Sequence, residues 1–264
     1  MPTHWFGLLV IGGVAGVLSG LFGIGGGVVI VPALVIFLGF TEIEAISTSL
    51  GALLLPVGAL AVIAYYRQNL LRLRDSAWIA AGLLLTTALG SLGALQLEAI
   101  NPDLLKSLYG VFLFYVGWRF VAPRRWYATW RDQTPPAAID GSLDPATSWP
   151  TVFAVGLVAG IASGLFGIGG GAVIVPALTA LLKYDQKLAV GTSLGALLLP
   201  VGLPGVLVYM DSGVLDLGVA ALVAVGLALG AIVGANIALS LPSATVKRMY
   251  GLFLFFVAAR FIFG

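Results

Sequence analysis

Apolar residues dominate this chain in long, nearly uninterrupted stretches. Four stretches fall in the first half, at residues 5–22, 43–66, 77–97 and 104–121, and counterparts follow after residue 150. Several of them reach the roughly 20 residues that a helix needs to cross a bilayer. The pattern predicts an all-α, polytopic membrane protein.

The composition agrees with a membrane protein and removes several kinds of chemistry. The chain is 60% hydrophobic and 9% charged, with a mean hydropathy of +1.08, far from a soluble domain. Its zero cysteines exclude disulfides, thiolate metal sites and cysteine nucleophiles. We expect no cofactor, no metal and no nucleic-acid partner. Residues 1–4 lack a positively charged signal region, so we expect 6–22 to belong to the mature protein.

Two motifs occur twice, and both copies are separated by 144 residues. The glycine-rich run Ser19–Pro32 returns as Ser163–Pro176, with Ala172 in place of Val28. A second run, 48–58, returns unchanged as 192–202. Internal repeats of this length are supersecondary units. The chain therefore consists of two related halves.

Each half begins with two short apolar arms around the glycine-rich run. In the first half the arms cover residues 5–40, with a break at 23–27. Each arm has about 14 to 18 residues, which is short for a full crossing. Two thin spans and a re-entrant hairpin both fit. The arms of the second half are expected at 151–166 and 170–182.

A longer helix follows the arms in each half. In the first half it should run from 42 to 66 behind a capping box of Thr41 and Glu44, with a break near Gly51, Pro56 and Gly58. Asp185 takes the same capping position in the second half. The remaining spans are expected at 76–97, 104–121, 186–209, 216–239 and 245–262.

The charges of the loops predict opposite orientations for the two halves. The 67–75 loop and the 122–150 linker are basic and should be cytoplasmic. The loop equivalent to 67–75 in the second half, 210–216, carries two aspartates and should lie outside. We therefore expect a first repeat at 1–121, a cytoplasmic linker at 122–150 and an inverted repeat at 151–264, each repeat with about four hydrophobic segments. Both termini would lie outside a bacterial-type inner cell membrane.

Inverted repeats with interrupted spans are typical of transporters that bind their substrate near the midplane. Glycines just ahead of a helix expose backbone N–H groups at the positive end of its dipole, which suits an anion. Serine and threonine add hydroxyl donors. The predicted substrate-contact residues are Ser19, Gly25, Gly26, Gly27, Thr48 and Ser49 in the first half, and Ser163, Gly169, Gly170, Gly171, Thr192 and Ser193 in the second. The predicted hinges are Pro32, Pro56, Pro176 and Pro200.

Each of these features also has a purely structural interpretation. Glycines in membrane helices commonly serve close packing, and serines commonly sit at helix contacts. The joint recurrence of glycine break, proline and Thr-Ser pair favours substrate contact. Tyr65 and Tyr209 match across the halves at span ends, where aromatic side chains anchor proteins at the membrane interface. No acidic residue is placed at mid-membrane, so a carboxylate proton relay is not visible.

The chain resembles the sulfite exporter TauE/SafE family of membrane transporters. The resemblance rests on Gly23–Gly27 followed by Val31 and Pro32, on the Thr48–Ser49 run, and on the repetition of both after a hydrophilic linker. It covers 5–121 and 151–262. It implies export or uptake of small sulfur-containing anions such as sulfite or sulfonates like sulfoacetate.

The leading function is therefore a secondary transporter, most simply an exporter, of a small sulfur-containing anion by alternating access, and not an enzyme. An anion channel on the same scaffold and a membrane-embedded hydrolase are the alternatives. The hydrolase lacks an assembled acid, base or nucleophile, because the single histidine is His4. The lipid bilayer is the other partner, a coupling proton stays open, and either a monomer or a homo-oligomer fits.

Overall fold

The computed structural model describes residues 5–22, 25–54, 59–121 and 149–240, with a few positions between 252 and 259. Every regular element in these ranges is an α-helix. The helices of the first half are α1 (Trp5–Phe22), α2 (Gly27–Leu38), α3 (Glu42–Ala52), α4 (Ala59–Arg67), α5 (Leu73–Ile100) and α6 (Pro102–Val121). Those of the second half are α8 (Trp149–Phe166), α9 (Gly171–Leu181), α10 (Gln186–Leu197), α11 (Leu203–Asp211) and α12 (Leu217–Ser240).

The described part contains four helices that are long and apolar enough to cross a membrane: α1, α5, α8 and α12. The apolar helices α2 and α9 are shorter. The predicted all-α, multi-pass membrane protein is confirmed. The predicted linker at 122–150, apart from its last two residues, and most of the predicted span at 245–262 lie outside the described residues.

Side-chain caps start α3 and α10 where the sequence placed them. The backbone N–H of Thr41 donates to Glu44 Oε2 at 2.9 Å, and the backbone N–H of Glu44 donates to Thr41 Oγ1 at 3.4 Å. This is the predicted capping box. In the second half, Asp185 Oδ1 accepts from the backbone N–H of Lys187 at 2.8 Å. Both helices thus begin at equivalent positions.

The long helix predicted after the arms is broken in both halves. The stretch 42–66 forms α3 and α4, and 186–209 forms α10 and α11, with Pro200 in the break. Pro56 lies outside the described residues. Pro32 and Pro176 are inside the short helices α2 and α9 rather than in breaks. The helices α2 and α9 begin directly after Gly26 and Gly170, so the break in each half lies at the glycines. Each proline then falls in the second turn of its helix.

The two arms of each half form a helical hairpin. A Cβ built on Gly7, near the start of α1, would lie 3.5 Å from Leu38 Cδ2 at the end of α2. A Cβ on Gly26, at the start of α2, would lie 3.4 Å from the Ala15 carbonyl oxygen of α1. The helix α2 therefore returns along α1, and Gly170 beside Ala159 shows the same return of α9 along α8.

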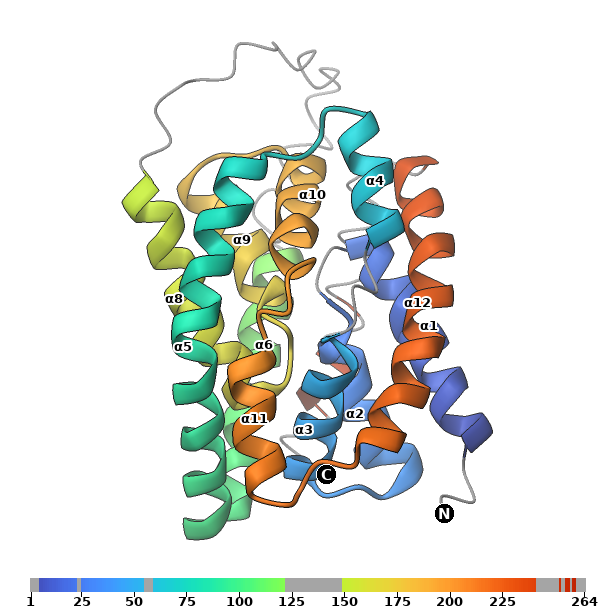
Figure 1. The fold of residues 1–264 in the computed structure, drawn as a ribbon, viewed down its shortest axis with the longest axis vertical. Coiled ribbons are helices and arrows are strands. Elements are labelled where there is room, and N and C mark those ends of the chain that lie inside the picture. The colour runs from blue at the N-terminus through green and yellow to red at the C-terminus, as the bar shows by residue number, and fades with distance from the viewer. Residues whose placement is uncertain are drawn as a thin grey trace.

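The long helices pair across the two halves. The helix α1 packs on α12 and α5 packs on α8, so each pair takes one member from each half (Figure 1). A Cβ on Gly16 would lie 2.3 Å from the Leu227 carbonyl oxygen, and one on Gly160 would lie 2.8 Å from that of Leu83. Glycine lets the backbones approach to this distance. Because each half supplies one helix to each pair, the two halves are interlocked.

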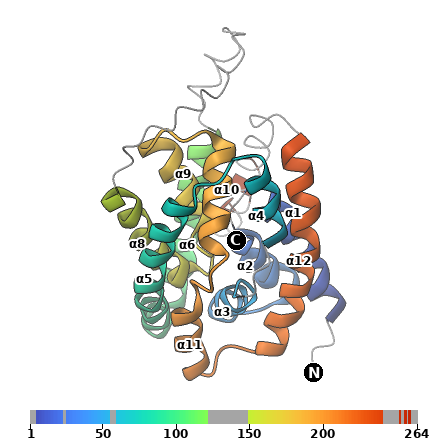
Figure 2. The same cartoon turned by 45° about the horizontal axis from the view of Figure 1, so that its top comes forward.

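Equivalent helices of the two halves run in opposite directions. In Figure 1, α5 descends from the top of the molecule to its base, whereas α12 rises from base to top. The same opposition holds for α1 and α8. The tilted view shows the same two pairs on either side of the short broken helices (Figure 2). The breaks of both halves therefore meet between the long pairs.

Candidate functional site

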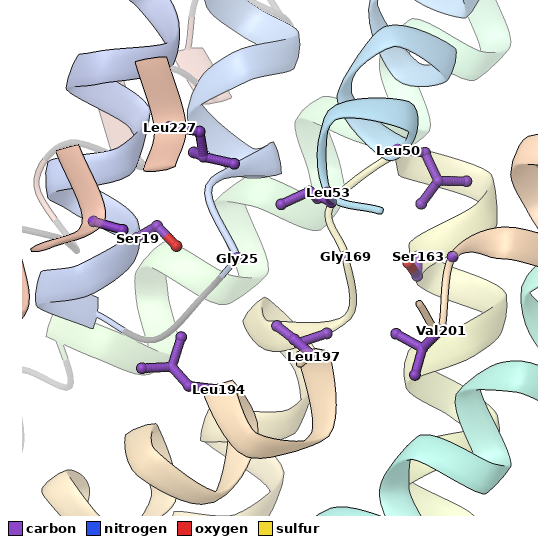
Figure 3. Close-up of a pocket in the computed structure, with 12 residues that line it drawn as sticks. Ser19, Gly25, Leu50, Leu53, Ser163, Gly169, Leu194, Leu197, Val201 and Leu227 are labelled. Carbon is purple, nitrogen blue, oxygen red and sulfur yellow. The ribbon is translucent and has the colours of Figure 1, made fainter. Parts of the chain in front are cut away.

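A small cavity lies where the broken elements of the two halves meet. Its volume is about 30 Å³. The first half contributes Ser19, Gly25, Leu50 and Leu53, and the second contributes their counterparts 144 residues later, Ser163, Gly169, Leu194 and Leu197. Figure 3 shows Gly25 and Gly169 between Ser19 on one side and Ser163 on the other. The repeated motifs thus supply a repeated lining.

Two helices start at this cavity from left-handed glycine turns. Gly25 and Gly26 have φ angles of 78° and 83°, and Gly169 and Gly170 have 69° and 84°. These values favour glycine because it lacks a Cβ. Gly26 and Gly170 are the N-cap residues of α2 and α9, and neither cap uses a side chain. The first-turn N–H groups of a helix lack partners within that helix, and they carry the positive end of its dipole.

The two glycine turns lie close together. A Cβ built on Gly25 would lie 3.9 Å from the Cα of Gly169. The starts of α2 and α9 therefore converge on one region instead of forming two separate sites. Two convergent helix N-termini favour an anion at this place.

Leucines of one half cover the glycine turn of the other. A Cβ on Gly25 would lie 3.2 Å from Leu197 Cδ1, and one on Gly169 would lie 2.8 Å from Leu53 Cδ1. Leu53 and Leu197 lie at the C-terminal ends of α3 and α10, next to the breaks. The cavity that they leave, of about 30 Å³, has room for only two or three water molecules, by the roughly 10–15 Å³ that one water requires. The structure is therefore a closed form of the site.

The two cavity serines differ in their surroundings. Ser163 is 0% exposed and its hydroxyl has no hydrogen-bond partner among the described residues. Ser19 is 6% exposed. A buried hydroxyl without a partner is unusual and calls for an explanation.

Gly27 and Gly171 do not line the cavity. A Cβ on Gly27 would lie 2.2 Å from the carbonyl oxygen of Gly167. Gly27 therefore serves the close approach of the two halves, which is the structural interpretation that the sequence left open for the glycines. Gly171 starts α9 and is buried in the same way.

The Thr-Ser pairs also lie outside the cavity lining. Thr48, Ser49, Thr192 and Ser193 are all buried. Ser49 Oγ donates to the Gly167 carbonyl at 2.7 Å, and Thr192 Oγ1 accepts from the backbone N–H of Arg72 at 3.3 Å. These two bonds join the halves. The cavity lining that α3 and its C-cap supply consists of Leu50 and Leu53 instead.

A charged cluster that the sequence did not reveal lies beside Thr192. The Tyr184 hydroxyl donates to Asp75 Oδ2, and Arg72 Nη1 lies 3.2 Å from the Tyr184 oxygen and 3.8 Å from Asp75 Oδ2. Asp75 is 6% exposed. The only local signal is the Arg72–Asp75 spacing of three residues, because Tyr184 is 109 positions away. The cluster lies at the start of α5 and not in the cavity.

The predicted interfacial role of Tyr65 and Tyr209 is wrong. Their side chains are 1% and 0% exposed. The Tyr209 hydroxyl donates to the Gly164 carbonyl at 2.6 Å. The rings turn inward from the ends of the short helices α4 and α11, so they pack within the protein.

The polar groups at the cavity are neutral donors. No charged side chain of the described residues lines it. Among the described residues, no group of three histidine, cysteine, aspartate or glutamate side chains could hold a metal ion. The arrangement can bind an anion through backbone N–H groups, hydroxyls and helix dipoles.

Comparisons with known proteins agree with a transporter. The family model described as "Sulfite exporter TauE/SafE" matches residues 8–261. A probable membrane transporter protein of Methanocaldococcus jannaschii is 30% identical over 212 residues, which cover 78% of this chain and 72% of that protein. One of Haemophilus influenzae is 29% identical over 95% of both chains. The probable membrane transporter protein YunE of Bacillus subtilis is 27% identical over 97% of this chain and 96% of its own. No solved structure matches the chain significantly.

Proposed function

The chain belongs to the sulfite exporter TauE/SafE family of membrane transporters, and on that premise we propose that it exports small sulfur-containing anions such as sulfite or an organosulfonate, for example sulfoacetate. The mechanism we propose is alternating access of a site at the convergent starts of α2 and α9. The observation that carries the proposal is the meeting of two glycine turns, Gly25–Gly26 and Gly169–Gly170, at one cavity.

The convergent helix starts supply what a sulfur oxyanion requires. Backbone N–H groups and two helix dipoles attract negative charge without a fixed cation. The absence of a Cβ at each glycine lets an oxygen atom approach the backbone. Ser19 and Ser163 add one hydroxyl on each side.

Opening of the site requires the covering leucines to move. Leu53 and Leu197 lie beside the breaks that separate α3 from α4 and α10 from α11. A rotation of either broken helix would uncover the glycine turn of the opposite half. Because the two halves are related and oppositely directed, uncovering Gly169 and uncovering Gly25 would open the site to opposite sides of the membrane.

The domains and orientation form part of the proposal. Residues 1–121 and 151–264 would be inverted repeats, joined by a cytoplasmic linker at 122–150, with both termini outside the cell membrane. One chain contains both halves of the site, so a monomer suffices. No carboxylate of the described part of the chain lines the cavity, so a proton gradient would act through protonation of the substrate or through loop residues such as Glu42 and Glu44.

Uptake into proteoliposomes tests the substrate class. Purified protein is reconstituted, and radiolabelled sulfite, sulfoacetate, taurine, sulfate and chloride are offered with and without a pH gradient. We expect saturable uptake of a sulfur-containing anion that its relatives inhibit by competition. If the folded protein moves none of these anions, the sulfur substrate class is wrong. Equal, non-saturating flux of chloride and the sulfur anions would instead support the channel.

A further inference from the structure

The polar residues around the cavity are not distributed equally between the two halves. Thr87 and Ser91 of α5 lie against α8, next to Gly164. The equivalent positions of α12, which lie against α1, are Ala231 and Ala235. The repeated motifs hide this difference because it falls in helices outside them.

Ser91 adds a second buried hydroxyl on the side of Ser163. Ser91 is 0% exposed and its Oγ has no hydrogen-bond partner among the described residues. It faces the Tyr209 hydroxyl oxygen. The proton of Tyr209 is already given to the Gly164 carbonyl. The Tyr209 oxygen is therefore the nearby acceptor for the Ser91 hydroxyl, in a geometry too poor for a normal hydrogen bond.

Ser91 lies close to a side chain that lines the cavity. A Cβ built on Gly205 would lie 2.5 Å from Ser91 Oγ and 2.9 Å from Leu50 Cδ2. The Ser91 hydroxyl and the cavity-lining Leu50 thus meet across the bare face of Gly205. The equivalent residue of the first half is Ala61. A displacement of Leu50 would connect Ser91 with the cavity.

Thr87 holds the nearby backbone in place. Its Oγ1 lies 2.6 Å from the Leu83 carbonyl oxygen and 3.2 Å from that of Val201, a residue that lines the cavity. Alanine at position 231 offers no such contact on the other side. The flank at Ser163 therefore carries more hydroxyl groups than the flank at Ser19.

We propose that the substrate binds in one orientation, with its oxyanion group at Ser163 and Ser91 and its organic body on the Ser19 side. There Leu227 and Ala231 line the cavity. This inference rests on the proposed function and narrows its substrate class. The site takes an organic anion with one sulfonate-type headgroup and a small apolar body, in preference to a symmetric inorganic oxyanion. The Ser19 flank and the Ser163 flank each lie at a glycine turn, so the helix dipoles attract the oxyanion group equally on both. The difference in hydroxyl groups therefore determines the orientation of the substrate.

Matched substitutions at equivalent positions test the orientation. The variants are Ser163→Ala and Ser91→Ala on one flank, with Ser19→Ala and Ala235→Ser on the other. Uptake of radiolabelled ethanesulfonate and sulfate into proteoliposomes gives KM for each variant. Gel filtration and thermal unfolding in detergent verify that each variant is folded.

We expect wild type to take up ethanesulfonate with a lower KM than sulfate. Ser163→Ala and Ser91→Ala should each raise the KM for ethanesulfonate about tenfold, as expected for a lost hydrogen bond to a charged group. Ala235→Ser, which lies outside the cavity lining, should change it less than about twofold, within the spread of neutral substitutions. Ser19→Ala should raise the KM for ethanesulfonate less than Ser163→Ala does, because the organic body of the substrate lies on the Ser19 flank. Gly205→Ala, which displaces Ser91, should resemble Ser91→Ala.

Two results would overturn the proposal, and they differ from each other. If wild type takes up the anions but substitutions on the two flanks change KM equally, the single orientation is wrong and the proposed transport function still stands. A wild-type protein that moves no sulfur-containing anion would remove the proposed function and this inference with it.

Discussion

Single glycine residues determine the geometry of the cavity. Gly26 and Gly170 hold φ angles of 83° and 84°, and a Cβ on them would lie 2.7 Å from Leu227 Cδ1 and 2.8 Å from Leu83 Cδ2. Any other residue meets both strain and a clash. Gly213 has a similar φ of 74° but nothing within 4 Å of a built Cβ. A substitution at Gly213 therefore shows the effect of backbone strain alone, without a change at the cavity.

Gly26→Ala and Gly170→Ala should each lower transport at least about tenfold, because the helix start loses the geometry that presents its N–H groups to the anion. Gly213→Ala carries the same left-handed strain of about 1–2 kcal/mol and should keep wild-type transport. Initial uptake rates per folded protein measure the difference. Equal activity of all three variants would show that the glycine turns do not bind substrate.

At this scale the sequence predicted the glycines and serines of the cavity but not the faces on which other residues lie. Of the twelve predicted substrate-contact residues, Ser19, Gly25, Ser163 and Gly169 line the cavity, and their contact with substrate stays a prediction. The Thr-Ser pairs were repeated just as strictly, yet they serve contacts between the halves. A motif that is repeated in both halves indicates that its two copies have similar surroundings. Whether those surroundings are a ligand site or a contact between helices depends on the packing of the helices, which the motif does not show.

At the scale of elements, two glycine-lined helix pairs form the frame. Contacts of α1 with α12 advance together along both helices, from Gly12 beside Val223 to Gly20 beside Ala231. The pair is therefore parallel. Because α1 belongs to the first half and α12 to the second, the frame cannot form from one half alone.

Gly16→Ala should destabilise the protein, since its Cβ would lie 2.3 Å from the Leu227 carbonyl oxygen and must separate the helices. Overpacking of this kind costs about 1–3 kcal/mol. Gly13→Ala on the same helix is the control, because the nearest atom would be 4.0 Å away. Thermal unfolding in detergent should show a lower midpoint for Gly16→Ala alone. A midpoint unchanged in both variants would contradict the close contact of α1 and α12.

Hydropathy and the motifs predicted the elements well. The expected arm at 5–22 is α1, and the expected break in 42–66 separates α3 from α4. The pairing of α1 with α12 could not be predicted, because glycine spacing shows that a helix packs closely and not against which partner. The difference between α5 and α12 was present in the sequence. It becomes visible only when Ser91 is compared with Ala235.

At the scale of the whole molecule, the two halves face opposite ways. The α4–α5 and α11–α12 connections lie at opposite ends (Figure 1). The chain has no cysteine, so single cysteines at the exposed Gln68 and Ser212 can report their side of the membrane. We expect an impermeant thiol reagent added to whole cells to label Ser212→Cys and to spare Gln68→Cys until the membrane is opened. Labelling of both from outside would contradict the inverted orientation.

The measurement that tests the central claim most directly is counterflow in proteoliposomes. Vesicles loaded with unlabelled sulfoacetate or sulfite receive a trace of the same labelled anion outside. Alternating access predicts a transient accumulation of label above equilibrium, because one site carries the anion in both directions. A monotonic approach to equilibrium at a rate independent of the internal anion would contradict alternating access and indicate an open channel.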